Sequence, residues 1–212
     1  MYNKTDIVQL IRLYGSQKVP IVSIRNAREL GGYIAEDNRT IKRGKLLRTG
    51  SLAKASAEDI VFLTSKYNLT LAIDLRSPVE VTKNPAPVMN GVRTVHIPLI
   101  EQTEMRRLMC ESCGGSEQFF GEDDPFSQIT DAVKLVQSGF YPQLYRWYVE
   151  SPDAQKSLKR VLREIEKHDD GAILLFCQEG KDRTGVVVAV LLAALGVNYE
   201  TILADYELTN LF

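Results

Sequence analysis

Short apolar runs alternate along the chain with longer stretches that have helix-like patterns of apolar and polar residues. The apolar runs predict strands at Val19–Ile24, Lys45–Thr49, Leu69–Leu75, Val92–Ile97 and Ala172–Phe176. The longer stretches predict helices over residues 56–67, 151–167, 184–195 and 198–208. Strands that alternate with helices favour a mostly parallel sheet covered by helices on both faces. The pattern therefore predicts an α/β fold.

Residues 101–150 interrupt this alternation, because about fifty positions show no strand pattern. They include two amphipathic stretches, at 126–136 and 140–149. The segment leaves the sheet at the end of a strand, the edge at which such sheets bind ligands. We expect a single domain over residues 1–212, with 101–150 inserted as a helical lid above a site at that edge.

Cys110 and Cys113 form a lone C-x-x-C within this insertion. Zinc would need two further ligands, and neither His96 nor His168 has a spacing that suggests a site. The chain has 3 cysteines, and an odd number does not indicate a disulfide framework. We expect two free thiols on a mobile loop, with a regulatory disulfide as the alternative.

The segment Cys177–Gly185 joins a predicted strand to a predicted helix and reads Cys-Gln-Glu-Gly-Lys-Asp-Arg-Thr-Gly. A loop whose amides converge at a helix N-terminus binds anions. Arg183 adds a planar fork that suits two phosphate oxygens, and the same positive field favours a thiolate at Cys177. A nucleotide-binding loop is excluded, because Asp182 follows Gly180-Lys181 where that motif needs serine or threonine. The alternative to an anion site is a structural cysteine beside a surface turn.

The composition is that of an ordinary globular protein, with 44% hydrophobic and 25% charged residues. The net charge of −1 gives no support for nucleic-acid binding. The N-terminus lacks the apolar core of a signal peptide, and the longest apolar stretch, Val186–Leu195, is shorter than the ~20 residues of a membrane span. We expect a cytoplasmic protein, with export by another route left open.

The chain resembles the tyrosine phosphatase-like family of bacterial and fungal cysteine phosphatases, whose loop reads C-x-x-G-K-D-R-T-G. Further blocks carry the same resemblance in order along the chain, at Asn26–Gly32, Leu47–Leu52, Ile73–Glu80 and Asp205–Asn210. The resemblance implies a cysteine-phosphatase fold and a protein-tyrosine-phosphatase type hydrolase with a phosphocysteine intermediate. It also implies dual specificity, extending to phosphoserine, phosphothreonine or phosphoinositides.

In that mechanism Cys177 attacks phosphorus, while Arg183 and the loop amides hold the oxygens. Thr184 is expected to donate a hydrogen bond to the Cys177 sulfur, with a helix cap as the alternative. Positive charge comes from the protein, so no metal or other cofactor is expected. Substrate contacts are predicted for the remaining loop residues and for two nearby pairs: Gln178, Glu179, Gly180, Lys181 and Gly185, then Asp74 with Arg76, and Asn26 with Arg28. Each pair also has a structural alternative. Asp74 and Arg76 would tie the end of their strand to the loop, and Asn26 and Arg28 would form part of a turn.

The general acid is not fixed by the sequence. The only tryptophan, Trp147, is followed by tyrosine, so the Trp-Pro-Asp motif of many cysteine phosphatases is absent. Asp182 is the first candidate, with an ion pair to a neighbouring cation as its alternative role. Asp74 is the second candidate, and Asp123 and Asp124 require the lid to close over the site.

Two loop residues, Lys181 and Glu179, bear on the choice of substrate, and Phe176, just before the loop, bears on how the loop is held. Lys181 would either contact a second phosphate on the substrate or be exposed to solvent without a substrate contact. Glu179 would repel polyanions if it pointed inward and would be neutral if it pointed outward. Phe176 replaces the family's histidine, which predicts a less tightly organised loop. Glu179 and Phe176 depart from the family's pattern, and these two departures leave a phosphate-binding pseudophosphatase as the main alternative. A sulfurtransferase or an arsenate reductase is a more distant one. The oligomeric state is not predicted.

Overall fold

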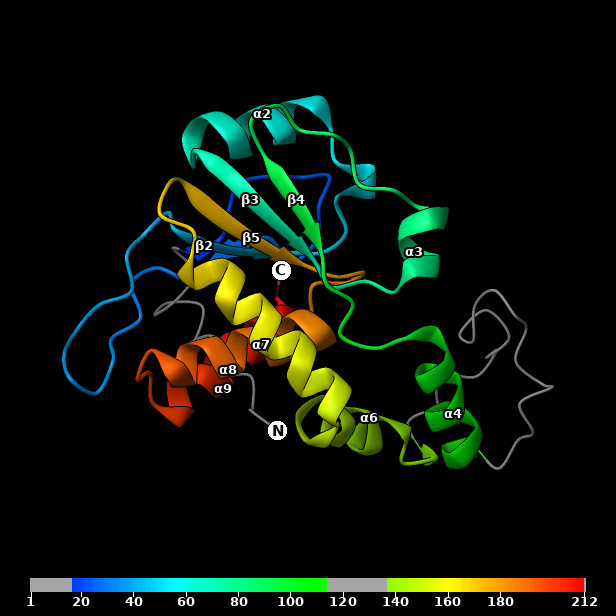
Figure 1. Cartoon of the computed structure of the whole chain (residues 1–212). Coiled ribbons are helices and arrows are strands. Elements are labelled where there is room, and N and C mark those ends of the chain that lie inside the picture. Colours follow the sequence, from blue (N-terminus) through cyan, green and yellow to red (C-terminus); the bar gives the residue numbers. More distant parts are fainter. Residues whose placement is uncertain (1–16, 114–136, 212) are drawn as a thin grey trace.

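Five strands form one sheet within residues 17–113 and 137–211, which the computed structural model describes (Figure 1). The strands are β1 (Arg28–Glu29), β2 (Leu46–Thr49), β3 (Leu69–Asp74), β4 (Arg93–His96) and β5 (Ala172–Phe176). Their order across the sheet is β1-β2-β5-β3-β4, and only β1 runs antiparallel to its neighbour among these strands. The predicted α/β fold with a mostly parallel sheet is confirmed.

Helices cover both faces of this sheet (Figure 1). The described helices are α2 (Ala57–Lys66), α3 (Pro78–Lys83), α4 (Gln102–Cys113), α6 (Phe140–Glu150), α7 (Pro152–Glu166), α8 (Asp182–Ala194) and α9 (Tyr199–Glu207), with short 3₁₀ turns η2 (Leu52–Lys54) and η4 (Leu208–Asn210). Helix α2 lies on one face, and α7, α8 and α9 lie on the other. Helices α4 and α6 extend the second layer beyond the end of the sheet.

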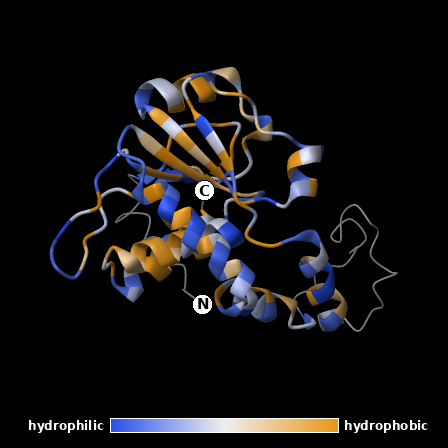
Figure 2. Ribbon diagram, in the orientation of Figure 1, coloured by the Kyte–Doolittle hydropathy of each residue, from blue (hydrophilic) through white to orange (hydrophobic). Residues whose placement is uncertain are grey.

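The central strand β5 shows why the sheet needs two covers. Its side chains alternate, so that Ile173 and Leu175 join the core under α6–α8 while Leu174 and Phe176 join the core under α2. All five of its residues are buried. Figure 2 shows the same apolar character in the central strands and in α8. Because β5 is covered on both faces, each of its side chains enters an apolar core. This explains the unbroken apolar run in its sequence.

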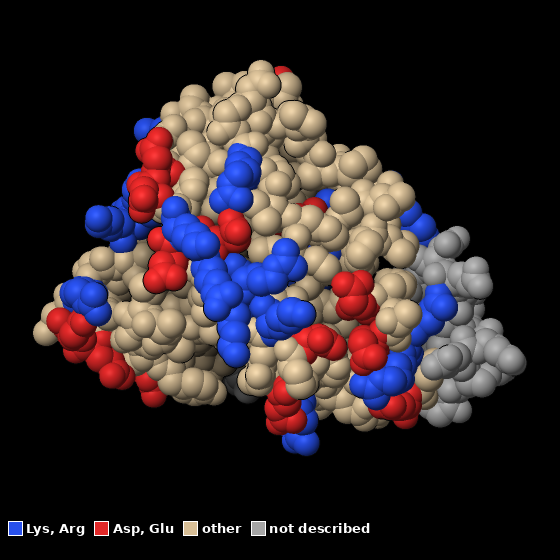
Figure 3. Space-filling model, viewed as in Figure 1, with Lys and Arg blue, Asp and Glu red and all other residues tan. Residues whose placement is uncertain are grey.

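Helix α7 separates its apolar and charged residues onto opposite sides. Ala154, Leu158 and Val161 are buried against the second layer. Lysines and arginines occupy the exposed side and form the basic band that crosses the molecule in Figure 3. The amphipathic pattern of this segment therefore reports its position at the surface.

The predicted strand at Val19–Ile24 is wrong, because this segment forms bends and turns. The carboxylate of Asp59 accepts hydrogen bonds from the backbone N–H groups of Val22 and Ser23, and Pro20 has no N–H to donate. Val19, Ile21 and Ile24 still pack into the core under α2. The edge of the sheet is instead formed by the two residues of β1.

The predicted loop around Cys110 is also wrong, because Cys110 lies in α4 and is buried. Ion pairs from Arg107 to Glu104 and Glu111 stabilise the exposed side of this helix. Met105, Leu108 and Met109 face the core. Because this segment is rich in polar residues, its amphipathic helical pattern was not recognised in the sequence. The predicted amphipathic stretch at 126–136, with Asp123 and Asp124, lies outside the described residues.

Helix α3 was not predicted either, and it begins at Pro78, shortly after β3 ends at Asp74. Ser77 caps α3 by accepting a hydrogen bond from the Glu80 N–H, and the Glu80 carboxylate accepts one from the Ser77 N–H. This reciprocal pair is a capping box, with proline at the first helical position. It fixes the backbone and the side chain of Glu80 together.

Among the described helices, none combines the length and the apolar character that crossing a bilayer requires.

Candidate active site

Cys177 lies directly after β5, at the carboxyl edge of the parallel strands. Its side chain is buried. The loop that follows leads into α8, whose first residue is Asp182. The N-terminus of this helix carries a partial positive charge and N–H groups without helical partners. The structure therefore places the thiol and the helix N-terminus at opposite ends of one short loop, as predicted.

The carbonyl groups of this loop are held by its neighbours. Asn26 Nδ2 donates hydrogen bonds to the carbonyl oxygens of Glu179 at 3.2 Å and of Gly180 at 2.8 Å. Arg48 Nη2 also donates to Gly180 O at 2.8 Å, and the Ser51 N–H donates to Gln178 O at 3.0 Å. In a trans peptide, the next N–H points away from the carbonyl. The N–H groups of residues 179–181 therefore point to the side of the loop opposite this brace.

Gly180 allows the loop to approach β2 closely. Its φ is +65°, and a Cβ atom there would lie 2.4 Å from the carbonyl carbon and oxygen of Thr49. No other residue fits this combination of backbone angle and space. The predicted loop glycine thus has a steric role in shaping the anion site.

Behind the brace, Asp205 lies between two buried arginines. Arg28 Nε donates to Asp205 Oδ1 at 3.2 Å, and Arg48 Nη1 donates to Oδ2 at 2.6 Å. Burial and the charge of Arg48 lower the pKa of Arg28 to about 10. Burial alone would raise the pKa of Asp205, but Arg48 and Arg28 outweigh it and lower that pKa. Arg28 therefore supports the loop from behind, through Asn26 and Asp205.

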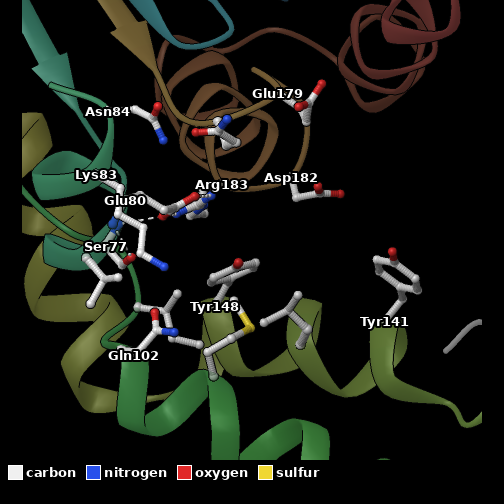
Figure 4. A pocket seen from close by; sticks show the side chains of 15 residues that line it. Ser77, Glu80, Lys83, Asn84, Gln102, Tyr141, Tyr148, Glu179, Asp182 and Arg183 are labelled. Carbon is white, nitrogen blue, oxygen red and sulfur yellow. Dashed lines mark hydrogen bonds and ion pairs between the residues drawn. The ribbon is translucent and has the colours of Figure 1, made fainter. Parts of the chain in front are cut away.

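Arg183 is held by Glu80 through two hydrogen bonds, Nη1 to Oε2 at 2.5 Å and Nη2 to Oε1 at 2.8 Å (Figure 4). Burial disfavours the charge of Arg183, but Glu80 and Cys177 outweigh burial and raise its pKa. A guanidinium has five N–H donors, and Glu80 occupies one on each terminal nitrogen. Within residues 17–113 and 137–211, the remaining donors of Arg183 form no other hydrogen bond.

A cavity of about 360 Å³ lies in front of this loop, with α3 beside it and α4 and α6 opposite (Figure 4). The predicted residues Gln178, Glu179, Asp182 and Arg183 line it. The remaining walls are formed by Ser77, Val79, Glu80, Lys83, Asn84, Ile100, Gln102, Met105, Tyr141, Leu144 and Tyr148. Helices from the predicted insertion at 101–150 thus supply the apolar wall.

The carboxylate of Asp182 is part of a hydrogen-bonded network that includes two tyrosine hydroxyl groups. Its Oδ1 accepts a short hydrogen bond from the Tyr145 hydroxyl and lies 3.5 Å from Lys181 Nζ. The Tyr145 hydroxyl also lies 2.5 Å from that of Tyr206. Burial disfavours the charge of Lys181, but Asp182 and two nearby tyrosines outweigh it and raise its pKa. Lys181 also lies 6.0 Å from the centre of the Tyr141 ring.

Glu179 lies at the rim of the cavity, where its carboxylate forms an exposed ion pair of 3.3 Å with Arg25. Of the two predicted orientations, the outward one is therefore observed. Phe176 is buried, and its ring packs under Arg76 with 5.4 Å between ring centre and guanidinium carbon. Phe176 therefore packs on Arg76, at the position where the family resemblance implied a histidine.

Asp74 and Arg76 do not line the cavity. Both carboxylate oxygens of Asp74 accept hydrogen bonds from Arg76, whose Nη1 continues to Ser51 Oγ at 3.1 Å and Asn84 O at 2.7 Å. The pair is buried and ties the end of β3 to the segments around the loop. This placement matches the structural alternative for both residues.

Thr184 and Gly185 occupy the first turn of α8. The Thr184 hydroxyl oxygen is buried without a hydrogen-bond partner in the described part of the chain, so the predicted bond to Cys177 is not formed here. A Cβ at Gly185 would lie 2.9 Å from the Tyr206 ring. Gly185 therefore lets α9 pack against α8.

Sequence reasoning gave no role to Arg48, Asp205, Tyr145 or Tyr148. Arg48 and Asp205 belong to blocks that carried the family resemblance, and this was the available signal for them. Tyr145 and Tyr148 lie in the insertion, where only an amphipathic pattern was visible.

In the described residues, no group of three or more His, Cys, Asp or Glu side chains is arranged to hold a metal ion.

Comparison with known proteins shows the family of this chain. Residues 19–212 match the model of the tyrosine phosphatase family, and the chain belongs to that family. The predicted family resemblance is thereby confirmed.

Two relatives match most of the chain. A Cupriavidus necator protein with a provisional tyrosine-protein phosphatase name is 32% identical over 197 residues, 92% of this chain and 64% of the relative. Triple specificity protein phosphatase PtpB of Mycobacterium tuberculosis is 28% identical over 190 residues, 84% of this chain and 65% of that protein. A tyrosine-protein phosphatase of Nostoc commune is 38% identical over 80 residues, 37% of this chain and 27% of that protein. The chain spans just under two thirds of the length of the first two relatives.

Proposed function

We propose that this chain is a cysteine-dependent phosphatase that hydrolyses phosphomonoesters, with phosphotyrosine as the preferred substrate. The observation that carries the proposal is the orientation of the loop after Cys177. Its carbonyls are bound by Asn26, Arg48 and Ser51, so its amides are left for an anion. Family membership supports the same conclusion.

The reaction has two steps. The Cys177 thiolate attacks phosphorus, and the bond from phosphorus to the leaving oxygen breaks as Asp182 gives that oxygen a proton. Arg183 and the loop amides bind the three equatorial oxygens and stabilise their charge in the transition state. Water then attacks the phosphocysteine and gives a proton back to Asp182. The sulfur–phosphorus bond breaks, and phosphate leaves.

Thr184 has a part in this proposal although its bond to sulfur is not formed. A buried hydroxyl without a partner is costly, so it is available to any acceptor that comes within reach. A thiolate leaving the phosphocysteine is such an acceptor.

The cavity in front of the loop favours an aromatic phosphate ester. Ile100, Met105 and Leu144 form an apolar wall beside Tyr141 and Tyr148. Such a wall suits the ring of phosphotyrosine better than a hydrated headgroup. Glu179 points outward to Arg25, so the charged side chains that remain on the lining are two cations, Lys83 and Arg183, and two carboxylates, Glu80 and Asp182. These charges give no excess of cations for a second phosphate, and we propose phosphoinositides as weaker substrates. We propose phosphoserine and phosphothreonine as weaker substrates too, because they have no ring to pack on the apolar wall.

The insertion at 101–150 acts as a lid in this proposal. Met105 of α4 and Leu144 of α6 cover the side of the cavity that faces away from the sheet. They exclude water from the reacting groups, which strengthens the charge interactions there.

Hydrolysis of p-nitrophenyl phosphate by the chain and by Cys177→Ser tests the reaction. We expect activity that falls by on the order of 10⁴-fold or more in the variant. Equal rates for the two proteins, or no turnover by either, would count against the enzyme and, in the second case, favour a phosphate-binding pseudophosphatase. A panel of one phosphotyrosine peptide, its phosphoserine counterpart and a phosphoinositide then ranks the substrates.

A further inference from the structure

Asp182 has two carboxylate oxygens in different surroundings. Oδ1 accepts the hydrogen bond from Tyr145 and is also the oxygen nearest Lys181, at 3.5 Å. Within residues 17–113 and 137–211, Oδ2 accepts no hydrogen bond, although Asp182 lines the cavity. One oxygen is thus held by the protein, and the other is left for a ligand.

The protons of the network can be assigned from its connections. Tyr145 has one O–H, and an acceptor-only carboxylate oxygen receives it. The hydroxyl of Tyr206, 2.5 Å away, must then donate to the Tyr145 oxygen. Burial and the neighbouring Asp182 raise the pKa of Tyr145, so its proton stays in place through the neutral range.

This assignment decides where a proton can sit on Asp182. Oδ1 faces the O–H of Tyr145 and the ammonium of Lys181, and a proton added there would meet two donors. The proton of the acid form must therefore sit on Oδ2. The same hydrogen bond from Tyr145 is kept in both protonation states, so the carboxyl group does not need to turn during the reaction.

We propose that Tyr145 is a positioning residue that directs the proton of Asp182 to the leaving oxygen of the substrate. This inference rests on the proposed phosphatase function. As the phosphorus–oxygen bond breaks, the proton moves from Oδ2 to the leaving oxygen, and its electron pair stays on Asp182. The Tyr145 O–H and Lys181 stabilise the carboxylate that results. In the second step the same carboxylate takes a proton from the attacking water.

Tyr145 also has a packing role, which the test must separate from the proton role. Its ring makes edge contacts with Tyr148 and Tyr206, with centres 6.1 and 6.3 Å apart. The contact with Tyr206 joins α6 to α9. Replacement by phenylalanine keeps the ring and removes only the hydroxyl, so Tyr145→Phe isolates the hydrogen bond.

The test compares a good and a poor leaving group, p-nitrophenyl phosphate and phenyl phosphate, in wild type, Tyr145→Phe, Asp182→Asn and the double variant. A general acid matters most when the leaving oxygen is basic. We expect Tyr145→Phe to lower kcat/KM about tenfold for phenyl phosphate and less than about threefold for p-nitrophenyl phosphate. The double variant should be no slower than Asp182→Asn, because the hydroxyl acts through that carboxylate.

Controls fix the interpretation. Inhibition by orthovanadate should be unchanged in Tyr145→Phe, because the anion site does not involve its hydroxyl. Tyr199→Phe, at an exposed tyrosine of α9, should match wild type on both substrates. Tyr206→Phe, which removes the donor to Tyr145, should show the same leaving-group dependence at smaller amplitude.

Three outcomes would overturn the inference. Equal losses on both substrates would make Tyr145 structural, and additive losses in the double variant would separate it from Asp182. An Asp182→Asn variant without leaving-group dependence would remove the acid role while the assignment of Cys177 stands. The proposed function fails by a different result, which is activity that survives Cys177→Ser.

Discussion

Arg183 meets Glu80 side to side, with its two terminal nitrogens 2.5 and 2.8 Å from the two carboxylate oxygens. Glu80 is itself fixed by the capping box of α3, where its Oε2 accepts a hydrogen bond of 2.7 Å from the Ser77 N–H. The orientation of the guanidinium thus depends on how a helix begins elsewhere in the sequence. A helix-capping glutamate also orients the guanidinium that we propose binds phosphate.

Glu80→Gln should therefore impair substrate binding more than folding. The amide keeps the shape but loses the charge and one of the two acceptors facing Arg183. We expect kcat/KM for p-nitrophenyl phosphate to fall about tenfold. Glu164→Gln, which removes an exposed ion pair with Arg93, is the matched control and should be silent. An unchanged kcat/KM in Glu80→Gln would show that Arg183 is oriented without it.

Gly180 offers a test of how the loop is shaped. Gly180→Ala places a Cβ atom 2.4 Å from the Thr49 carbonyl at a φ of +65°. We expect a loss of about 3 kcal/mol or more in unfolding free energy, or a displaced loop without activity. Gly91→Ala has a φ of +76° but open space around its Cβ, so it should lose about 1 kcal/mol. Equal urea midpoints for both variants would contradict the steric account.

Asp205 should control stability at acid pH. Its pKa is lower in the folded chain, so the carboxylate contributes stability above its unfolded pKa of ~4 and loses it as pH falls through the folded value. Asp205→Asn removes the carboxylate that pairs with buried Arg28 and Arg48, and should cost about 3–5 kcal/mol at neutral pH. The difference in unfolding free energy between wild type and Asp205→Asn should narrow as pH falls below ~4. Denaturant unfolding at several pH values measures this difference, with the exposed Asp37→Asn variant as control. A gap that is constant with pH would contradict the account.

Glu179 should have little effect on a substrate with one phosphate. It points outward and pairs with Arg25, and both side chains are exposed. Solvent and salt screen such charges. We expect Glu179→Gln to change kcat/KM for p-nitrophenyl phosphate by less than about twofold at physiological salt. A tenfold gain would show that the carboxylate turns toward the cavity and opposes the anion.

The parts of the fold that could be predicted are those set by local sequence. β5, the loop and α8 follow one another directly, and an apolar run, a glycine and a second apolar segment indicate them without reference to the rest of the chain. The same is true of α2, whose cap residue Ser56 accepts a hydrogen bond from the Asp59 N–H. Local signals were sufficient for the elements that carry Cys177 and Arg183.

Two of the features that were missed depend on distant partners. The carboxylate of Asp59 takes the N–H groups of Val22 and Ser23, which no pattern near residue 22 reveals. Asp205 reaches Arg28 and Arg48 from the other end of the chain. Asp74 and Arg76 satisfy each other rather than a ligand, and only their mutual geometry distinguishes the two possibilities.

Capture of the covalent intermediate tests the central claim most directly. The chain is mixed with phosphorus-labelled p-nitrophenyl phosphate, quenched in acid within one turnover, digested, and mapped for the labelled peptide. The account predicts label on Cys177, and none in Cys177→Ser. Turnover by the wild type with no label on that peptide, or with label on another residue, would contradict it.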